Sequence, residues 1–364
     1  MKIATILGTR PEIIRLSLII PKLDQLAGKH ILIHTGQNHA ATLSDVFFEE
    51  LGLRNPDYLL ETHQPTLGGQ LAVMFGEIER ILTFEQIELV LLLGDTNSAL
   101  NAIIAERLGI PVVHMEAGNR CFDLRVPEEK NRKVIDAISS INMPYTEYSK
   151  GNLLREGFPP QRIVVTGNPI YEVLEHYKTP IAASDILERL GLQPQHYLLV
   201  TAHRAENVDE PEHLAAIMEG INRAAEETGL PAICSVHPRT RSKLDSMAAK
   251  VKLHPLVQLH EPFGFFDFVK LEQHALCAIT DSGTVQEECC IFHVPTVTIR
   301  NTTERPETID CGSNVVAGLQ PSRIVQAVKA MTALPAAWEP PSGYLAQDVS
   351  DKVVKFVLGG KWNV

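Results

Sequence analysis

Short apolar runs alternate with longer amphipathic segments along the chain, and this alternation predicts the fold class. In the first half, apolar runs at 3–7, 31–34, 89–93, 112–115, 141–145 and 163–166 are typical of strands. The segments at 12–26, 69–84, 98–108 and 129–138 have the apolar spacing of helices. Near-continuous apolar strands joined by helical crossovers indicate a parallel sheet covered on both faces.

The second half repeats this alternation. Strands are predicted at 197–201, 232–236, 257–259, 278–280 and 296–299, with helices including 211–227 and 285–291. About eleven strands are many for one sheet, so two doubly wound α/β domains are the simpler prediction. The turn at Thr166-Gly167-Asn168-Pro169 separates an N-terminal Rossmann-like domain, 1–168, from a C-terminal one, 169–345. A last amphipathic helix within 346–364 is expected to pack back on the first domain.

Composition and charge narrow the class of protein. A length of 364 residues suits two domains, and a net charge of −11 argues against general nucleic-acid binding. No apolar run is long enough for a membrane span, and a strand begins directly at the N-terminus, so we expect a soluble, cytoplasmic protein without membrane partners. The cysteines and histidines show no metal-ligand spacing, and we expect no metal.

Acidic side chains follow two of the predicted strands. Asp95 follows the strand at 89–93, while Glu116 and Glu128 follow the strand at 112–115. Ligands bind beyond the carboxyl ends of parallel strands, so these acids predict a site for proton chemistry. Alternatively, Asp95 caps a helix from Asn97 and Glu128 favours the start of the next helix. The density of carboxylates and arginines at 114–132 favours the site.

Arginines near the first strand indicate anion binding. Gly8-Thr9-Arg10-Pro11-Glu12 opens a helix, where backbone N–H groups attract anions and Arg10 can hold a phosphate. Arg15, one turn later, can point toward the same place. The turn lacks the glycine pattern of dinucleotide-binding proteins, and a plain strand–helix turn is the alternative.

Two histidines end strands of the second half. His203 is followed by Arg204 in a polar loop, which favours a functional role over a structural one. His237 ends the next strand, and functional and structural roles are equally supported there.

The segment beginning at Asp281 gives the strongest phosphate signal. Ser282 and Gly283 lie where a strand meets a helix N-terminus, which suits a pyrophosphate. Glu288 in the following helix can accept from ribose hydroxyls, and Arg305 in a later Arg-Pro turn is a further candidate ligand. The alternative is that Asp281 or Ser282 only caps the helix.

Together these stretches resemble the non-hydrolysing UDP-N-acetylglucosamine 2-epimerase family. The matching motifs occur in one order across almost the whole chain: GTRPE at Gly8, HTGQ at His34, GDTNS at Gly94, HMEAGNR at His114, PEEKNR at Pro127, TGN at Thr166, AHRAEN at Ala202, HPRTR at His237, DSGTVQEE at Asp281 and TERPE at Thr303. The resemblance implies two Rossmann-like domains in the GT-B arrangement, a UDP-sugar in the interdomain cleft, no cofactor and a homodimer.

The resemblance also implies a mechanism and a division of roles. UDP is eliminated as C2 loses its proton, a 2-acetamidoglucal intermediate forms, and UDP re-adds with inversion at C2. Such an enzyme supplies precursors of cell-surface polysaccharides. The implied catalytic residues are Asp95, Glu116, Glu128 and His203, and the spacing does not decide which acid takes the C2 proton. The implied UDP ligands are Arg10, Arg15, His237, Ser282, Gly283, Glu288 and Arg305.

Departures from the family pattern leave the sugar open. Asn38, followed by His39, stands where family members that act on UDP-N-acetylglucosamine usually have histidine, which puts allosteric regulation in doubt. The stretch 119–127 and Thr284 resemble the subgroup that forms UDP-N-acetyl-L-fucosamine from a 6-deoxy-talose sugar. A GT-B glycosyltransferase and a hydrolysing epimerase are the competing hypotheses, and the several acids of the first domain favour the epimerase over the transferase.

Overall fold

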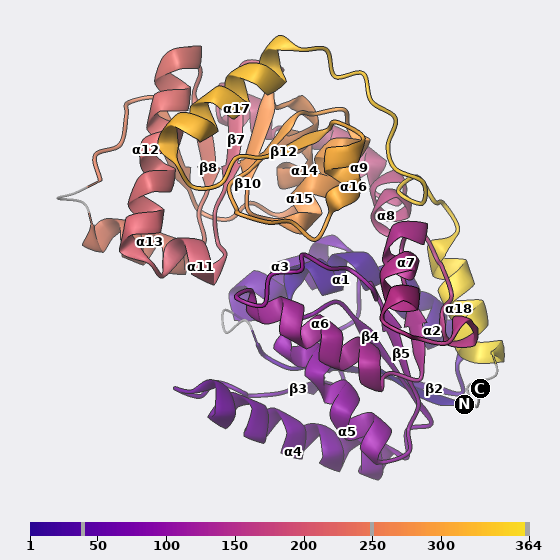
Figure 1. Cartoon of the computed structure of the whole chain (residues 1–364). Coiled ribbons are helices and arrows are strands. Elements are labelled where there is room, and N and C mark those ends of the chain that lie inside the picture. The colour runs from indigo at the N-terminus through magenta and orange to yellow at the C-terminus, as the bar shows by residue number, and fades with distance from the viewer. Residues whose placement is uncertain (38–40, 248–250, 361–364) are drawn as a thin grey trace. The chain divides into compact units, whose positions relative to one another are not determined.

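A computed structural model describes residues 1–37, 41–247 and 251–360, which form two compact units (Figure 1). Unit 1 comprises Met1–His176 and Ser342–Val364, and unit 2 comprises Tyr177–Pro341. Each unit contains a six-stranded parallel sheet, with strand order β3-β2-β1-β4-β5-β6 in unit 1 and β12-β11-β10-β7-β8-β9 in unit 2. The predicted α/β class with two doubly wound sheets is therefore confirmed.

The first strand of unit 1, β1, lies in the interior of its sheet, between β2 and β4. Its strands are β1 (Lys2–Leu7), β2 (Lys29–His34), β3 (Tyr58–Leu59), β4 (Leu89–Leu93), β5 (Val112–Met115) and β6 (Ile141–Met143). Its helices are α1 (Arg10–Leu16), α2 (Ile19–Leu26), α3 (Ala41–Glu50), α4 (Leu67–Glu85), the 3₁₀ helix η1 (Asn97–Asn101), α5 (Ala102–Arg107), α6 (Pro127–Ile138), α7 (Glu147–Arg155), the 3₁₀ helix η2 (Pro160–Arg162), α8 (Ile170–His176) and α18 (Val349–Gly359).

Unit 2 has the same alternation of strands and helices. Its strands are β7 (Leu198–Thr201), β8 (Ala232–Ser235), β9 (Val257–His260), β10 (Cys277–Thr280), β11 (Thr296–Thr298) and β12 (Asn314–Val316). Its helices are α9 (Lys178–Ala183), α10 (Ile186–Arg189), α11 (Ala205–Val208), α12 (Pro211–Thr228), α13 (Pro238–Ser246), α14 (Phe265–His274), α15 (Gly283–Ile291), α16 (Pro306–Asp310) and α17 (Pro321–Ala333).

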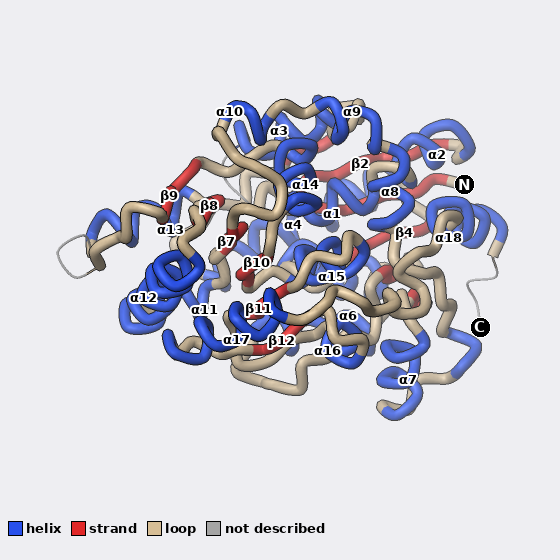
Figure 2. The backbone as a smooth tube through the Cα atoms, turned by 90° about the horizontal axis from the view of Figure 1, so that it is seen from above, coloured by secondary structure: helices blue, strands red, loops and turns tan. Residues whose placement is uncertain are grey.

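Burial on both faces explains why the strands are apolar at every position. In unit 2, Leu198 and Val200 of β7 pack with α12 and α17, which lie next to each other in Figures 1 and 2. Leu199, between them, packs on the opposite face with α14 and α15. Successive strand residues thus face different helical layers, and each sheet orients its strand ends toward one edge.

The division between the units differs in position from the predicted one. The first crossing lies at His176–Tyr177 rather than at residue 168, because α8 stays with unit 1. Glu172 of α8 accepts a hydrogen bond from the backbone N–H of Ser350 at 2.8 Å, which joins α8 to α18. The chain re-enters unit 1 at Ser342, a few residues before the predicted position.

Proline explains two further differences from the predicted elements. The helix predicted at 12–26 is broken into α1 and α2, and Pro21 lies in the first turn of α2, where its missing N–H costs no helical hydrogen bond. The strand predicted at 163–166 is only an extended segment with one isolated bridge between Asn142 and Ile163. Val164 and Thr166 donate to Asn142 and Pro144, but Pro144 has no N–H to continue the pairing.

Two remaining expectations concern the membrane and residues 38–39. Within the described ranges, no helix is both long and apolar enough to span a bilayer. Asn38 and His39 lie outside the described residues.

Candidate functional site

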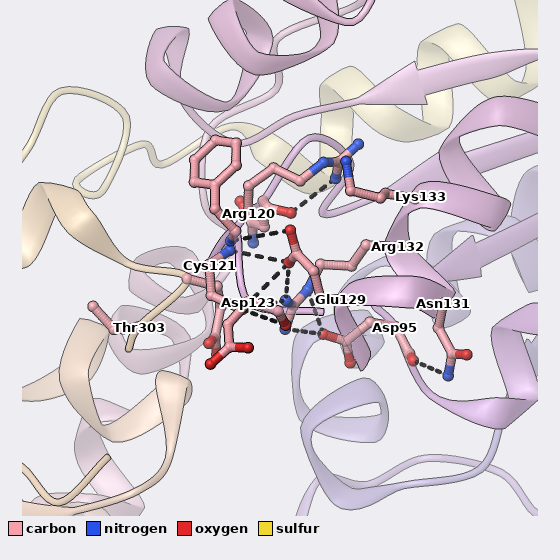
Figure 3. Close-up of polar contacts among 12 residues, drawn as sticks. Asp95, Arg120, Cys121, Asp123, Glu129, Asn131, Arg132, Lys133 and Thr303 are labelled. Carbon is pink, nitrogen blue, oxygen red and sulfur yellow. Dashed lines mark hydrogen bonds and ion pairs between the residues drawn. The ribbon is translucent and has the colours of Figure 1, made fainter. Parts of the chain in front are cut away.

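The turn after β4 presents Asp95, which α6 holds in place. Gly94 has φ of 80°, a left-handed conformation that glycine adopts at little cost, and the turn exposes 20% of the Asp95 side chain. Arg132 of α6 donates from Nε to Asp95 Oδ2 at 2.8 Å (Figure 3). Asn131 donates to the Asp95 carbonyl at 2.9 Å. Both the backbone and the carboxylate of Asp95 are thus positioned from one helix.

Two adjacent acids at the start of α6 have different environments. Glu129 is fully buried and accepts from Arg132 Nη1 at 2.9 Å, from the Cys121 N–H at 3.0 Å and from the Phe122 N–H at 3.1 Å (Figure 3). Its carboxylate therefore fixes the loop before α6. Glu128 is half-buried in the first helical turn, and it is the member of the pair with access to solvent.

Glu116, after β5, has a strained backbone. Its φ is 66°, in the left-handed region that a side chain with a Cβ rarely adopts. The carboxylate is 8% exposed and forms an ion pair with Arg15 of α1. The Arg15 guanidinium also lies 5.7 Å from the ring centroid of Tyr145. Strain that the surrounding fold maintains is common at functional sites, and here it directs a carboxylate toward an arginine.

A buried network joins the two acid-bearing loops. His114 of β5 bonds through Nε2 to the Gly94 carbonyl at 2.8 Å and through Nδ1 to Asp136 of α6 at 2.9 Å. Asp136 also accepts from the Gly118 N–H at 3.1 Å and pairs with Arg120 at 2.8 Å. The loop of Asp95 and the loop of Glu116 are therefore tied to one carboxylate that has no exposed surface.

Both ring nitrogens of His114 face acceptors, which suits an imidazolium. Burial alone would lower the pKa of His114, but the hydrogen bond and negative charge of Asp136 outweigh burial and raise that pKa above its ordinary value.

The turn after β1 uses its backbone donors internally. The N–H groups of Gly8 and Thr9 donate to Glu12 at 2.7 Å each, and Thr96 donates to the other carboxyl oxygen at 2.7 Å. Arg10 lies 5.6 Å from the ring centroid of Phe47. The N–H groups that the sequence suggested for a phosphate thus already hold a carboxylate, while Arg15 lies with the acids through Glu116.

In unit 2, Asp281 organises the loop after β7. β7 and β10 are neighbours, so the residues that follow them meet at one edge. The buried Asp281 accepts from the N–H groups of His203 and Arg204 at 3.0 and 2.9 Å, and from Asn207 at 2.9 Å. Its carboxylate lies 3.2 Å from His203 Nδ1, while 45% of the His203 side chain is exposed. Asp281 therefore orients a histidine that solvent can reach.

The Ser282-Gly283 turn lies against a charged cluster. A Cβ on Gly283 would lie 2.6 Å from Glu304 Oε1, so glycine lets the Glu304 carboxylate lie directly against the turn. Glu304 pairs with Arg204 at 3.2 Å and with Arg300 at 2.8 Å. Ser282, at the N-cap of α15, is half-buried.

The remaining predicted ligands of unit 2 lie at different depths. Arg305 is buried and forms an ion pair with Glu287 of α15. Glu288, which follows Glu287 on α15, is 3% exposed. His237 follows β8 and is half-buried. Unit 2 thus brings His203, the Ser282-Gly283 turn and Arg305 to one sheet edge, where the buried carboxylates of Asp281 and Glu287 lie next to His203 and Arg305.

Several residues that support these sites were missed by the sequence analysis. Glu129, Arg132 and Asp136 lie three and four residues apart along α6, and this spacing on one helical face is the signal that could have found them. Nothing in the sequence indicates that Asp136 meets His114, or that Asp281 holds the loop at 203–207.

Comparisons with known proteins agree with this geometry. The family model for UDP-N-acetylglucosamine 2-epimerase matches residues 22–358. A UDP-N-acetylglucosamine 2-epimerase of Methanocaldococcus jannaschii is 40% identical over 368 residues, covering 100% of both chains. A UDP-2,3-diacetamido-2,3-dideoxy-D-glucuronate 2-epimerase of Pseudomonas aeruginosa is 37% identical, covering 90% of this chain and 92% of its own.

A solved structure extends the likeness to the fold. The crystal structure of the Methanocaldococcus jannaschii UDP-GlcNAc 2-epimerase in complex with UDP-GlcNAc and UDP matches with a TM-score of 0.92 and 39% identity, covering 98% of this chain and 99% of that one. The fold and these likenesses define an isomerase with two Rossmann-like domains of the GT-B class. The chain belongs to the UDP-N-acetylglucosamine 2-epimerase family.

Proposed function

We propose that this enzyme inverts C2 of a UDP-N-acetylhexosamine, of the UDP-GlcNAc/UDP-ManNAc type, without hydrolysing it. The observation that carries the proposal is the pair of acids at neighbouring strand ends of unit 1. Asp95 is held by Arg132, and Glu116 is held by Arg15 with a left-handed backbone. Inversion of C2 by proton transfer removes a proton from one face and returns one to the other, and two acid/base groups on opposite sides of the carbon suit this reaction.

The proposed reaction has two balanced stages. A base of unit 1 takes the C2 proton while the C1–O bond to UDP breaks and its electron pair leaves with UDP, giving a 2-acetamidoglucal. UDP then re-adds at C1 while an acid returns a proton to the opposite face of C2. Asp95, Glu116 and Glu128 are the proposed acid/base groups, and the assignment of the first proton among them stays open.

Unit 2 is proposed to bind the nucleotide. The Ser282-Gly283 turn at the N-terminus of α15 suits the pyrophosphate, with Arg305 close to it. His203, oriented by Asp281, is proposed to assist the leaving phosphate oxygen, and Glu288 to accept from the ribose hydroxyls. Arg10, Arg15 and His237 complete the proposed UDP ligands; for Arg15 this requires that it serve both Glu116 and the substrate.

The experiment that tests the proposal follows C2 directly. The enzyme is incubated in D₂O with UDP-GlcNAc and no acceptor, and NMR follows the sugar. Deuterium at C2 together with UDP-ManNAc supports the proposal. Free sugar and UDP at equilibrium would instead identify a hydrolysing epimerase, and no exchange with any sugar tried would refute C2 chemistry altogether.

Two further nucleotide sugars should be tested as substrates in the same assay. The residues at 119–127 resemble the subgroup that forms UDP-N-acetyl-L-fucosamine, and one relative carries the name of a diacetamido-glucuronate epimerase. UDP-2-acetamido-2,6-dideoxy-L-talose and UDP-2,3-diacetamido-2,3-dideoxy-D-glucuronate are therefore compared with UDP-GlcNAc by kcat/KM. The largest value identifies the sugar.

We further propose a cytoplasmic homodimer that supplies precursors of cell-surface polysaccharides. Support comes from the family resemblance and from the nucleotide-activated substrate. Light scattering of the purified protein tests the dimer, and a monomer at assay concentration would refute it.

A further inference from the structure

Glu272 of α14 is a buried acid with an unusual environment. Glu272 has no exposed surface. Among the described residues, no amide, hydroxyl or cationic side chain donates a hydrogen bond to either of its carboxyl oxygens. An ionised carboxylate in such a place would be very costly, because nothing compensates for the loss of water. The surroundings therefore favour the neutral acid.

The group that Glu272 contacts is another acid. Helix α14 packs on α15, and Glu288 of α15 is the neighbouring group whose charge and hydrogen-bonding capacity act on the Glu272 carboxyl. Two carboxyl groups can form a hydrogen bond only when one of them holds a proton. Burial raises the pKa of Glu272 well above its ordinary value, and the neighbouring charge of Glu288 raises it further. Glu272 is thus the proton holder and the donor.

The three polar residues that precede Cys289 on α15 have separate partners. Gln286 accepts from Thr303 at 2.6 Å, and Glu287 pairs with Arg305. Glu288 faces α14 instead. Glu288 keeps 3% of its surface exposed, whereas Glu272 keeps none, so Glu288 is the less enclosed member of the acid pair.

We propose that Glu272 is a positioning residue for nucleotide recognition, which as a neutral acid donates to Glu288 and keeps it an anionic acceptor for the ribose diol. This inference rests on the proposed role of Glu288. A carboxylate has about four acceptor positions, so Glu288 can accept from Glu272 and from two ribose hydroxyls at once. If the proton moved to Glu288, that residue would lose acceptor capacity on the side of the ligand.

The test compares two substitutions of Glu272. Glu272→Gln keeps a donor of nearly the same shape, because its amide can bond to Glu288. Glu272→Met keeps the length and removes the donor. Calorimetry measures the affinity of each full-length variant for UDP and for 2′,3′-dideoxy-UDP, which lacks both ribose hydroxyls. We expect Glu272→Met to bind UDP roughly tenfold more weakly, as for a lost hydrogen bond to a charged group. Glu272→Gln should stay within about threefold of the wild type, since it restores that bond.

The dideoxy nucleotide separates positioning from a general structural role. All variants should bind it as the wild type does. In the C2-exchange assay, Glu272→Met should raise KM while largely retaining kcat. Tyr197→Phe is the matched control, since the Tyr197 hydroxyl donates to the Leu271 carbonyl of the same helix and not to Glu288. It should leave both affinities unchanged.

Three results would overturn the inference. Glu272→Met could bind UDP as the wild type does, or lose affinity equally for both nucleotides, which would indicate a structural role. Alternatively, Glu288→Ala could leave the preference for UDP over dideoxy-UDP intact. That result would remove the ribose role of Glu288 itself, whereas C2 exchange would still report separately on the proposed epimerase chemistry.

Discussion

Replacing Asp136 with Asn tests whether the buried network of unit 1 holds the acid-bearing loops in place. The Asp136 carboxylate accepts from His114, from the Gly118 N–H and from Arg120, and none of its surface is exposed. Asn has one acceptor oxygen and one donor amide in the same shape. Asn can therefore serve only part of this set, and the substitution leaves the buried charge of Arg120 without one of its two carboxylate partners.

The expected loss of stability is large. Removing one partner of a buried ion pair costs about 3–5 kcal/mol. In a domain of this size, each kcal/mol shifts the melting temperature by about 2–4 °C, so the transition of unit 1 should fall by roughly 6–20 °C. Turnover should fall as well, because His114 would no longer hold the Gly94 carbonyl next to Asp95. A displacement of about 1 Å at such a group reduces turnover about 100-fold.

Calorimetry and the C2-exchange assay measure both effects. Glu156→Gln is the control, because Glu156 is the second partner of Arg120 and 27% of its side chain is exposed. Its loss should cost about 1 kcal/mol or less. A difference of about 2 °C corresponds to no more than about 1 kcal/mol in a domain of this size. If Asp136→Asn melted within about 2 °C of this control, with turnover unchanged, the network would carry neither the stability nor the positioning assigned to it.

The same variant should change the pH dependence of stability. The raised pKa of His114 contributes stability that is fully present below the unfolded value near 6.5 and is lost as pH rises through the folded pKa. Asp136→Asn removes this contribution. The difference in unfolding free energy between wild type and variant should therefore be largest below pH 6.5 and shrink at higher pH. A constant difference from pH 5 to 9, measured by urea titration, would contradict the assignment, since that range brackets ordinary histidine titration.

Three further predictions concern single carboxylates. Glu12→Gln should make stability less pH-dependent. Burial raises the pKa of Glu12 to about 7, although four hydrogen bonds act in the opposite direction, so wild-type stability falls as pH rises from about 4.5 to about 7. Urea titrations that show the same fall in the variant would refute this. Glu116→Gln and Glu128→Gln should each lose most turnover while calorimetric UDP affinity changes little; a variant with wild-type C2 exchange is not missing an acid/base group. Asp281→Asn should lower kcat about 100-fold by releasing His203, and a normal kcat with only KM raised would confine Asp281 to binding.

The sequence predicted five strands of each sheet and missed one edge strand of each, β3 in unit 1 and β12 in unit 2. β4 and β5 have the predicted bounds because continuous apolar residues mark buried parallel strands. β3 has only two residues, and β12 begins with the polar Asn314, so neither has a pattern that distinguishes it from a loop. Short edge strands depend on the neighbour to which they pair, and that neighbour is set by tertiary structure.

The candidate acids could be predicted, but their partners could not. Asp95 and Glu116 follow apolar strands, and topology alone brings such residues to one edge. The partner of Asp95 lies on α6, and that of Glu116 lies on α1, far away in the sequence. The backbone donors of Gly8 were expected to bind phosphate, but sequence could not show that Glu12 already accepts from them.

The return of the chain end to unit 1 affects how the protein is made on the ribosome. Helix α18 packs on α2, Lys22 donates to Ser350 at 2.7 Å, and these contacts belong to the unit that contains β1. Unit 2 is complete in sequence at Pro341, before α18 has been synthesised. At bacterial or eukaryotic rates of about 5–20 residues per second, the nascent first unit waits on the order of ten seconds or more for its last helix. The unit that is translated first is therefore the last to be finished.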